Sequence, residues 1–279
     1  MPSLDFSENS SSCRRVDLDV PEPTFSQRYE NMSDTMVVDV SQDWATACDV
    51  QQRFMHQAVP ASLDIAYAAR CRQLRALGGD CHDFLPLAHD SMAFAIGDAS
   101  GKSLPAALMI ANVQSSLRTA AFFVGGQPAA LLGTVNRQLH ESSLADQFAT
   151  LFFGVFDLAT RTLRYANAGH NPPLIIRPDA PSVVLETTGL PLGLFPDSTY
   201  QEGTHRLHSG DVLIAYTDGL IEAVNQTGEE WGLHGLRRAA LGSHAKGASE
   251  LLEAIFASLD EFSQGRLADD ATAVVLFLR

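Results

Sequence analysis

Runs of apolar residues of two lengths divide the chain into its expected elements. Short runs bounded by turn residues are typical of buried strands. They predict strands at residues 63–74, 91–97, 149–158, 162–169, 173–177, 182–186, 199–207, 211–217 and 271–278. Longer segments with helical spacing predict helices at residues 41–57, 105–123, 128–143, 233–241 and 248–262. Pro105 stands where a first-turn proline suits a helix, and residues 75–90 are interpreted as a loop.

The order of these elements indicates the fold class and the domains. Helices are grouped between runs of strands without strict alternation, which favours an α+β fold of largely antiparallel sheets with helices packed outside. Residues 1–40 are polar and aperiodic, so they predict a flexible tail. Residues 41–58 predict a linker helix, and residues 59–279 are expected to form one catalytic domain.

Composition excludes several classes of function. Lys and Arg number 19 against 33 Asp and Glu, so the formal charge is −14 and no nucleic-acid partner is expected. The four cysteines form no CxxC pair, and the start lacks the pattern of a secretory signal. No apolar run approaches the roughly 20 residues that cross a bilayer. We therefore expect a soluble cytoplasmic protein with reduced thiols and no membrane partner.

Carboxylates border three of the expected strands. Asp98 and Asp218 each follow an apolar run directly. Asp269 and Asp270 stand just before the last strand. In an antiparallel arrangement the exit ends of two strands and the entry end of a third can lie on one edge of a sheet. Asp80 lies in a Gly-Gly-Asp turn, where backbone can approach a ligand closely. Each aspartate taken singly could also be an ordinary turn residue, because Asp is common in turns.

Clustered carboxylates have a specific chemistry. They repel each other unless protons or cations neutralise them, and hard oxygen ligands of this kind suit Mg²⁺ or Mn²⁺. Two such ions can polarise a phosphoryl oxygen, activate a water and orient in-line attack on a serine or threonine phosphate. The acids therefore indicate a dinuclear metal site that needs no protein nucleophile.

A series of motifs gives the chain a family resemblance. Between Asp43 and Arg279 they are, in order, LGGDCHDF, GDASGKSLPAALMIA, FATLFFGVFDLATRTLRYANAGHNPPLII, GLPLGLF, GDVLIAYTDGLIEAVN and DDATAVVL. The series resembles the SpoIIE/RsbU-type branch of the PPM (type 2C) metal-dependent serine/threonine phosphatases. This resemblance implies an α-β-β-α sandwich of two mainly antiparallel sheets flanked by helices, with two Mn²⁺ or Mg²⁺ ions at one end.

The same resemblance implies roles for individual residues. It assigns the metal ions to four acids and one backbone carbonyl, namely Asp80, Asp98, Asp218, Asp269 and the carbonyl of Ala99. Asp83 and Asp270 are alternates, either as further ligands or as partners that orient metal-bound water. Arg75 lies where relatives place a phosphate-binding arginine, although a plain surface arginine is the other reading.

Cys81 and His82 depart from the family pattern, which more often has aromatic residues at these two positions. The departure leaves the metal acids intact but could alter substrate preference. Adjacent Cys and His side chains lack the usual spacing of a zinc site or a thiol catalyst, which disfavours both readings.

Two motifs invite other functions. GDASGKS follows an apolar run, but Gly97 and Gly101 enclose fewer residues than a P-loop requires, which disfavours a nucleotide switch. Lys102 then reads as a loop lysine, either near the metal site or facing solvent. His170 could protonate a leaving group, or it could hydrogen-bond to the backbone of its own turn.

The resemblance also implies a substrate and partners. The expected substrate is phosphoserine or phosphothreonine on a regulatory protein, by analogy a STAS-domain anti-sigma-factor antagonist in bacterial partner-switching signal transduction. The rival hypothesis is a pseudophosphatase that binds proteins without turnover, which the complete set of acids disfavours. The helix at residues 41–58 lies where relatives carry a switch or dimerisation helix, so we expect it to form a homodimer or to receive a partner.

Overall fold

This computed structural model describes residues 34–55, 65–87, 91–177, 180–243 and 247–279, with side chains from residue 42 onward. The residues up to Trp44 and those from Ala45 onward form two units, and the second contains both sheets. Helix α1 spans Asp34–Met55. It therefore begins before the predicted start at residue 41, because the β-branched valines at positions 37, 38 and 40 weaken the helical signal there. The remainder of the predicted tail, residues 1–33, lies outside the described residues.

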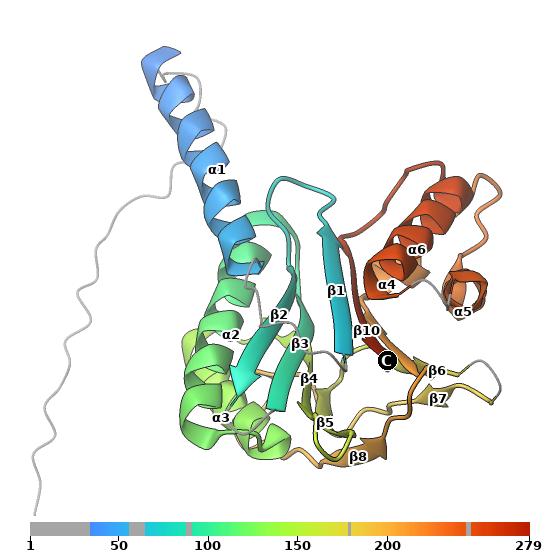
Figure 1. Cartoon of the computed structure of the whole chain (residues 1–279). Coiled ribbons are helices and arrows are strands. Elements are labelled where there is room, and N and C mark those ends of the chain that lie inside the picture. Colours follow the sequence, from blue (N-terminus) through green and yellow to red (C-terminus); the bar gives the residue numbers. More distant parts are fainter. Residues whose placement is uncertain (1–33, 56–64, 88–90, 178–179, 244–246) are drawn as a thin grey trace, which may run out of the picture. The chain divides into compact units, whose positions relative to one another are not determined.

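Within the described residues, ten strands form two antiparallel sheets, which confirms the predicted class (Figure 1). The first sheet has the order β1-β10-β9-β6-β7. Its strands are β1 (Ile65–Arg72), β10 (Ala271–Leu278), β9 (Val212–Tyr216), β6 (Leu174–Ile176) and β7 (Val183–Val184). The second sheet has the order β2-β3-β4-β5-β8. Its strands are β2 (Asp80–Leu87), β3 (Ser91–Ala99), β4 (Ala149–Asp157), β5 (Thr162–Ala168) and β8 (Gly203–Arg206).

Helices cover the outer face of each sheet. Helices α2 (Ser103–Val124) and α3 (Pro128–Ser142) pack on the second sheet, and α5 (Gly232–Ser243) and α6 (Ala248–Ser263) pack on the first (Figure 1). A third apolar core lies between the two sheets. Three cores between four layers confirm the predicted α-β-β-α sandwich. In the part of the chain that the structure describes, no helix is both long and apolar enough to cross a bilayer.

Two elements differ from the sequence-based expectation. The loop predicted at residues 75–90 is wrong in part, because Asp80–Leu87 forms strand β2. Polar Asp80, His82 and Asp83 are all buried in this strand, so its period of two is hidden in the apolar pattern. The short helix α4 (Asp218–Ile221) follows β9 directly and was not predicted. Both corrections fall where the sequence places acids of the candidate site.

Candidate metal centre

Asp80 and Asp98 face each other across two neighbouring strands. Asp80 opens β2, Asp98 lies near the end of β3, and the antiparallel register pairs the two residues directly. Directly opposed residues project on the same face of a sheet, with their Cβ atoms about 4.5–5.5 Å apart. The two acids that the sequence places 18 positions apart (98 − 80 = 18) therefore meet at one corner of the second sheet.

Asp218 and Asp269 meet at the ends of two neighbouring inner strands of the first sheet, β9 and β10. Asp218 is the first residue of α4, directly after β9, and Asp269 lies just before β10, which pairs with β9. The two segments approach closely, since a Cβ added at Gly219 would lie 2.1 Å from the carbonyl oxygen of Asp270. Only glycine allows this approach, which holds Asp218 beside Asp269.

Two buried threonines join the sheets at Asp80. The Oγ1 atom of Thr217 donates a hydrogen bond to Oδ2 of Asp80 at 2.8 Å, and Oγ1 of Thr272 donates to the same atom at 2.6 Å. Both threonines are fully buried. The only trace of them in the sequence is their position beside the acidic motifs, in YTDG and DDAT. They fix a carboxylate of the second sheet to two strands of the first.

Burial and repulsion between carboxylates raise the pKa values of Asp80, Asp98 and Asp218. Burial, followed by the charges of Asp218 and Asp269, raises the pKa of Asp98 to about 7. The pKa of Asp80 is raised well above its usual range by burial and then by the charge of Asp98, although the bonds from Thr272 and Thr217 oppose the rise. Burial also raises the pKa of Asp218. Negative charge on these three acids is therefore destabilised in the folded chain, and a bound cation would offset that destabilisation.

The donor set fits a hard divalent cation. Carboxylate oxygens and a backbone carbonyl are the ligands that Mg²⁺ and Mn²⁺ prefer. Gly79 keeps the site open, because a Cβ there would lie 3.0 Å from the carbonyl oxygen of Ala99 and 3.2 Å from Oδ1 of Asp98. Within the described ranges no three His, Cys, Asp or Glu side chains already form an ion cage. Ligation would therefore require the neighbouring carboxylates to turn toward a common centre.

Lys102 lies at the rim of the site. Its Nζ atom is 2.7 Å from Oδ2 of Asp269 and donates to the carbonyl oxygen of Ala268 at 3.3 Å. Both side chains of the ion pair are about half exposed, so the pair contributes little to stability. Its position agrees with the reading of Lys102 as a loop lysine near the acids.

Asp270 holds the loop that leads into β2. Its Oδ1 accepts a hydrogen bond from the backbone N–H of Leu74 at 2.7 Å, and its Oδ2 accepts from the N–H of Gly79 at 2.8 Å. Gly78 has no room for a side chain, since an added Cβ would lie 2.3 Å from Oδ2 of Asp270. Asp270 thus acts through the backbone that carries Asp80.

The structure does not bring Asp83 to the acid group. Successive strand residues alternate between faces, so Asp83 projects on the face opposite Asp80. There its carboxylate accepts hydrogen bonds from Arg118 of α2 at 2.6 and 3.1 Å. Burial raises the pKa of Asp83, and the bond from Arg118 opposes that rise.

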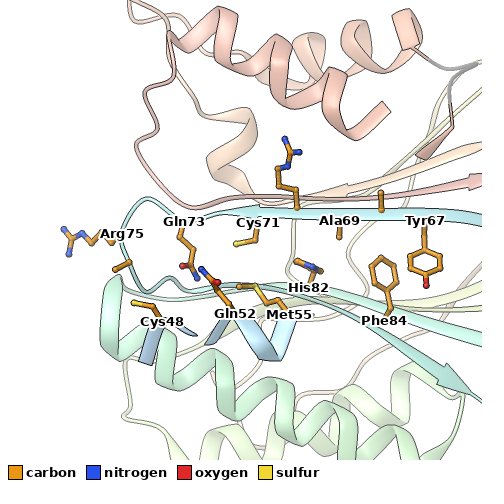
Figure 2. A pocket seen from close by; sticks show the side chains of 13 residues that line it. Cys48, Gln52, Met55, Tyr67, Ala69, Cys71, Gln73, Arg75, His82 and Phe84 are labelled. Atoms are coloured by element: carbon orange, nitrogen blue, oxygen red, sulfur yellow. The ribbon is translucent and has the colours of Figure 1, made fainter. Parts of the chain in front are cut away.

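Arg75 is exposed on the loop between β1 and β2, at the rim of a cavity. The cavity has a volume of about 950 Å³, and its lining comes from β1, β2 and the end of α1. In Figure 2 the guanidinium of Arg75 points away from the other lining residues, whereas Tyr67 and Cys71 face His82 and Phe84. The charge of Arg75 opposes the rise in the pKa of Lys102 that Asp269 causes, so the two cations lie within electrostatic range.

The surroundings of His170 and Cys81 indicate structural roles for both residues. His170 is buried, its Nδ1 lies 2.9 Å from Oγ1 of Thr150, and burial lowers its pKa to about 3. The imidazole is therefore neutral near pH 7, which favours the structural reading over proton transfer. Cys81 packs in the core beneath α2, where burial raises the pKa of its thiol well above the usual range. Its thiol therefore lies on the face away from Asp80.

Comparison with known proteins identifies the family. The family model described as Stage II sporulation protein E (SpoIIE) matches residues 88–279. The matched range contains Asp98, Asp218 and Asp269 and begins after Asp80.

Individual relatives agree with this match. The chain is 28% identical over 233 residues to the phosphoserine phosphatase RsbU of Bacillus subtilis, covering 82% of this chain and 68% of RsbU. It is 28% identical over 255 residues to protein IcfG of Synechocystis sp., covering 82% of this chain but only 40% of IcfG. The solved SiaA-PP2C domain of Pseudomonas aeruginosa has a TM-score of 0.74 at 20% identity, covering 88% of this chain and 98% of that domain, and so shares the fold. The chain therefore belongs to the SpoIIE family, in the SpoIIE/RsbU-type branch of the PPM phosphatases.

Proposed function

We propose that this chain hydrolyses phosphoserine or phosphothreonine on a regulatory protein with the help of two divalent cations. The observation that carries the proposal is that Asp80 and Asp98 are paired in the second sheet, while Asp218 and Asp269 of the first sheet lie close enough to Asp98 to raise its pKa. Such a concentration of partly buried carboxylates is unfavourable unless cations bind between them. The membership of the SpoIIE family supports the same chemistry.

The described residues have distinct roles in this proposal. The ions, Mn²⁺ or Mg²⁺, would be held by Asp80, Asp98, Asp218, Asp269 and the carbonyl of Ala99. When bound, they would polarise the phosphoryl group and lower the pKa of a water. Thr217 and Thr272 hold Asp80 in place, while Arg75 and Lys102 supply positive charge at the rim for the phosphate.

A chain of this fold could instead bind proteins without turnover. A pseudophosphatase would not need to retain a full set of acids, because each buried carboxylate reduces the stability of the metal-free fold. All four acids are present, and the pKa of Asp98 is raised by burial and then by the charges of Asp218 and Asp269. These features favour the enzyme.

The proposed partner is a phosphorylated STAS-domain protein of a partner-switching system. RsbU, with 28% identity and 82% of this chain covered, is the relative on which this proposal rests. The formal charge of −14 argues against a nucleic-acid substrate.

Removal of metal ions should abolish phosphate release. In EDTA we expect a phosphorylated STAS-domain protein to lose phosphate at the background rate, and excess Mn²⁺ should restore the rate, because no side chain replaces the activated water. Colorimetric phosphate release measures this. Equal release in EDTA and Mn²⁺ would reject the metal mechanism. Release from a phosphoserine peptide but not from the STAS protein would reject the STAS-domain substrate and leave the metal mechanism standing.

Replacement of Arg75 by alanine should weaken phosphate binding. A charge-assisted hydrogen bond contributes roughly 1.5–3 kcal/mol, so the KM for p-nitrophenyl phosphate should rise about tenfold or more, while the affinity for Mn²⁺ stays constant. Steady-state kinetics and calorimetry measure the two quantities. Arg206, exposed on the edge strand β8, provides the matched control Arg206→Ala. An unchanged KM in Arg75→Ala would show that Arg75 is a plain surface residue.

A further inference from the structure

The end of α1 is bonded to the loop that precedes Asp80. Gln51 is buried, although its neighbours Val50 and Gln52 on the same helix are exposed. Its Nε2 donates to the carbonyl oxygen of Gly78 at 2.7 Å, and its Oε1 accepts from the N–H of Gly78 at 3.2 Å. One side-chain amide therefore satisfies both backbone groups of a single residue, two positions before Asp80.

The orientation of this amide is itself fixed. Nε2 of Gln73 donates to Oε1 of Gln51 at 2.9 Å. Gln73 directly precedes the loop residues 74–79, so Gln51 is bonded to the loop at its start and near its end. A buried amide with its hydrogen bonds made holds its partners in a defined geometry, whereas apolar packing alone does not.

The same loop is held from its other side by Asp270. That carboxylate accepts the N–H groups of Leu74 and Gly79, so the loop lies between Gln51 and Asp270. The loop carries Arg75 and ends at Asp80. The two side chains therefore act on the segment that supplies both a phosphate contact and a metal acid in the proposed function.

Arg118 connects the last turn of α1 to the residues that follow Asp80 in β2. Arg118 of α2 donates to the carbonyl oxygen of Phe54 at 2.5 Å and forms its ion pair with Asp83 of β2. A cation at the carbonyl end of a helix is favourable because the last carbonyls lack partners within the helix. The end of α1 is thus bonded to the chain on both sides of Asp80. Gln51 bonds to Gly78 before it, and Arg118 connects Phe54 to Asp83 after it.

We infer that Gln51 is a positioning residue that fixes the loop carrying Arg75 and leading into Asp80. The inference rests on the proposed function, because it concerns the same site. Loss of the amide would leave the N–H and C=O of Gly78 without their present partner in a buried position, and the loop would move to satisfy them. Asp80 and Arg75 would then no longer be held in the geometry that metal and phosphate need.

The test compares Gln51→Met with the wild-type full-length chain. Methionine keeps the length of the side chain and removes its hydrogen bonds. Mn²⁺ alone is titrated by calorimetry, kcat and KM are measured with p-nitrophenyl phosphate, and thermal unfolding is recorded without metal. We expect about a tenfold weaker affinity for Mn²⁺ and a higher KM, with kcat at saturating Mn²⁺ within about threefold of wild type. Val50→Ala, one position before Gln51 on the helix and exposed, should match wild type.

A purely structural role would give a different result. If Gln51→Met lowers the unfolding temperature but leaves Mn²⁺ affinity and KM unchanged, the inference is overturned. Gln73→Ala removes only the bond that orients Gln51 and should shift Mn²⁺ affinity and KM in the same direction by less, so it tests the inference if Gln51→Met does not fold. No shift with Gln73→Ala would then overturn it. A wild-type chain that binds no Mn²⁺ would overturn the proposed function, and with it this inference.

Discussion

Asp98→Asn should lose phosphatase activity without losing its metal-free fold. Asp98 faces Asp80 across the β2–β3 pair, and an amide is neutral and a weaker ligand for a hard cation. We expect phosphate release at saturating Mn²⁺ to fall on the order of 100-fold or more, because even partners behind a metal ligand typically cost 10–100-fold. Phosphate release and Mn²⁺ calorimetry measure the two effects.

The stability of this variant separates loss of function from loss of structure. The pKa of Asp98 is about 7 in the folded chain against an ordinary value of 3.8, so its ionised form destabilises the metal-free fold. That destabilisation is absent below the ordinary pKa and is complete above about pH 7. The unfolding temperature of metal-free Asp98→Asn should therefore equal or exceed that of wild type at about pH 8, and the difference should shrink toward pH 4.

Asp157 provides the control for this prediction. Asp157 is the partly buried last residue of β4 and pairs with Ser91, at the end of the β3–β4 pair opposite to Asp98. Its Oδ1 accepts a hydrogen bond from the N–H of Thr160. Asp157→Asn keeps an acceptor there and should retain wild-type activity. If Asp98→Asn and Asp157→Asn release phosphate equally fast, Asp98 has no role in the reaction.

Gly219→Ala should destabilise the chain and displace Asp218. The new Cβ would lie 2.1 Å from the carbonyl oxygen of Asp270 and 3.1 Å from the carbonyl carbon of Asp269. These are backbone atoms beside the central strand β10, so relief requires the segments to separate. Overpacking of this kind costs about 1–3 kcal/mol, and we expect a value near the upper end. Urea unfolding measures the loss, and Mn²⁺ affinity should fall with it.

A second glycine gives the matched control. Gly133 lies within α3, and a Cβ there would meet nothing within 4 Å. Gly133→Ala should therefore stabilise the chain by roughly 0.5–1 kcal/mol, because alanine favours the helix. Unchanged stability and Mn²⁺ affinity in Gly219→Ala would show that the close approach of Gly219 to Asp270 is not needed for the site.

The sequence predicts most elements but not strand β2, which begins with Asp80 of the candidate site. The sequence patterns identify every described strand except β2, whose residues Asp80, His82 and Asp83 are polar and buried. The two acids are accommodated by partners that are distant in sequence, Thr217 and Thr272 for Asp80 and Arg118 for Asp83. A local sequence pattern does not indicate such distant partners, so the polar residues of β2 predict a loop.

The residues of the candidate site are predictable, whereas their supports are not. Asp80 and its bonding partner Thr217 lie 137 positions apart, and Asp80 and Thr272 lie 192 apart. Motif order can suggest that the acids meet, but these contacts depend on how the two sheets stack. The assignment of Asp83 as an alternate ligand illustrates the limit, because only the strand register shows that it projects on the other face.

The place of β10 in the first sheet has a consequence for synthesis. This strand is the last element of the described chain, yet it lies in the sheet between β1 and β9, and Asp269, Asp270 and Thr272 enter with it. A nascent chain still lacking β10 can form the β2–β3 pair but has neither the second threonine on Asp80 nor the carboxylate that secures the loop before it. The proposed metal centre is therefore completed only after β10 has emerged from the ribosome.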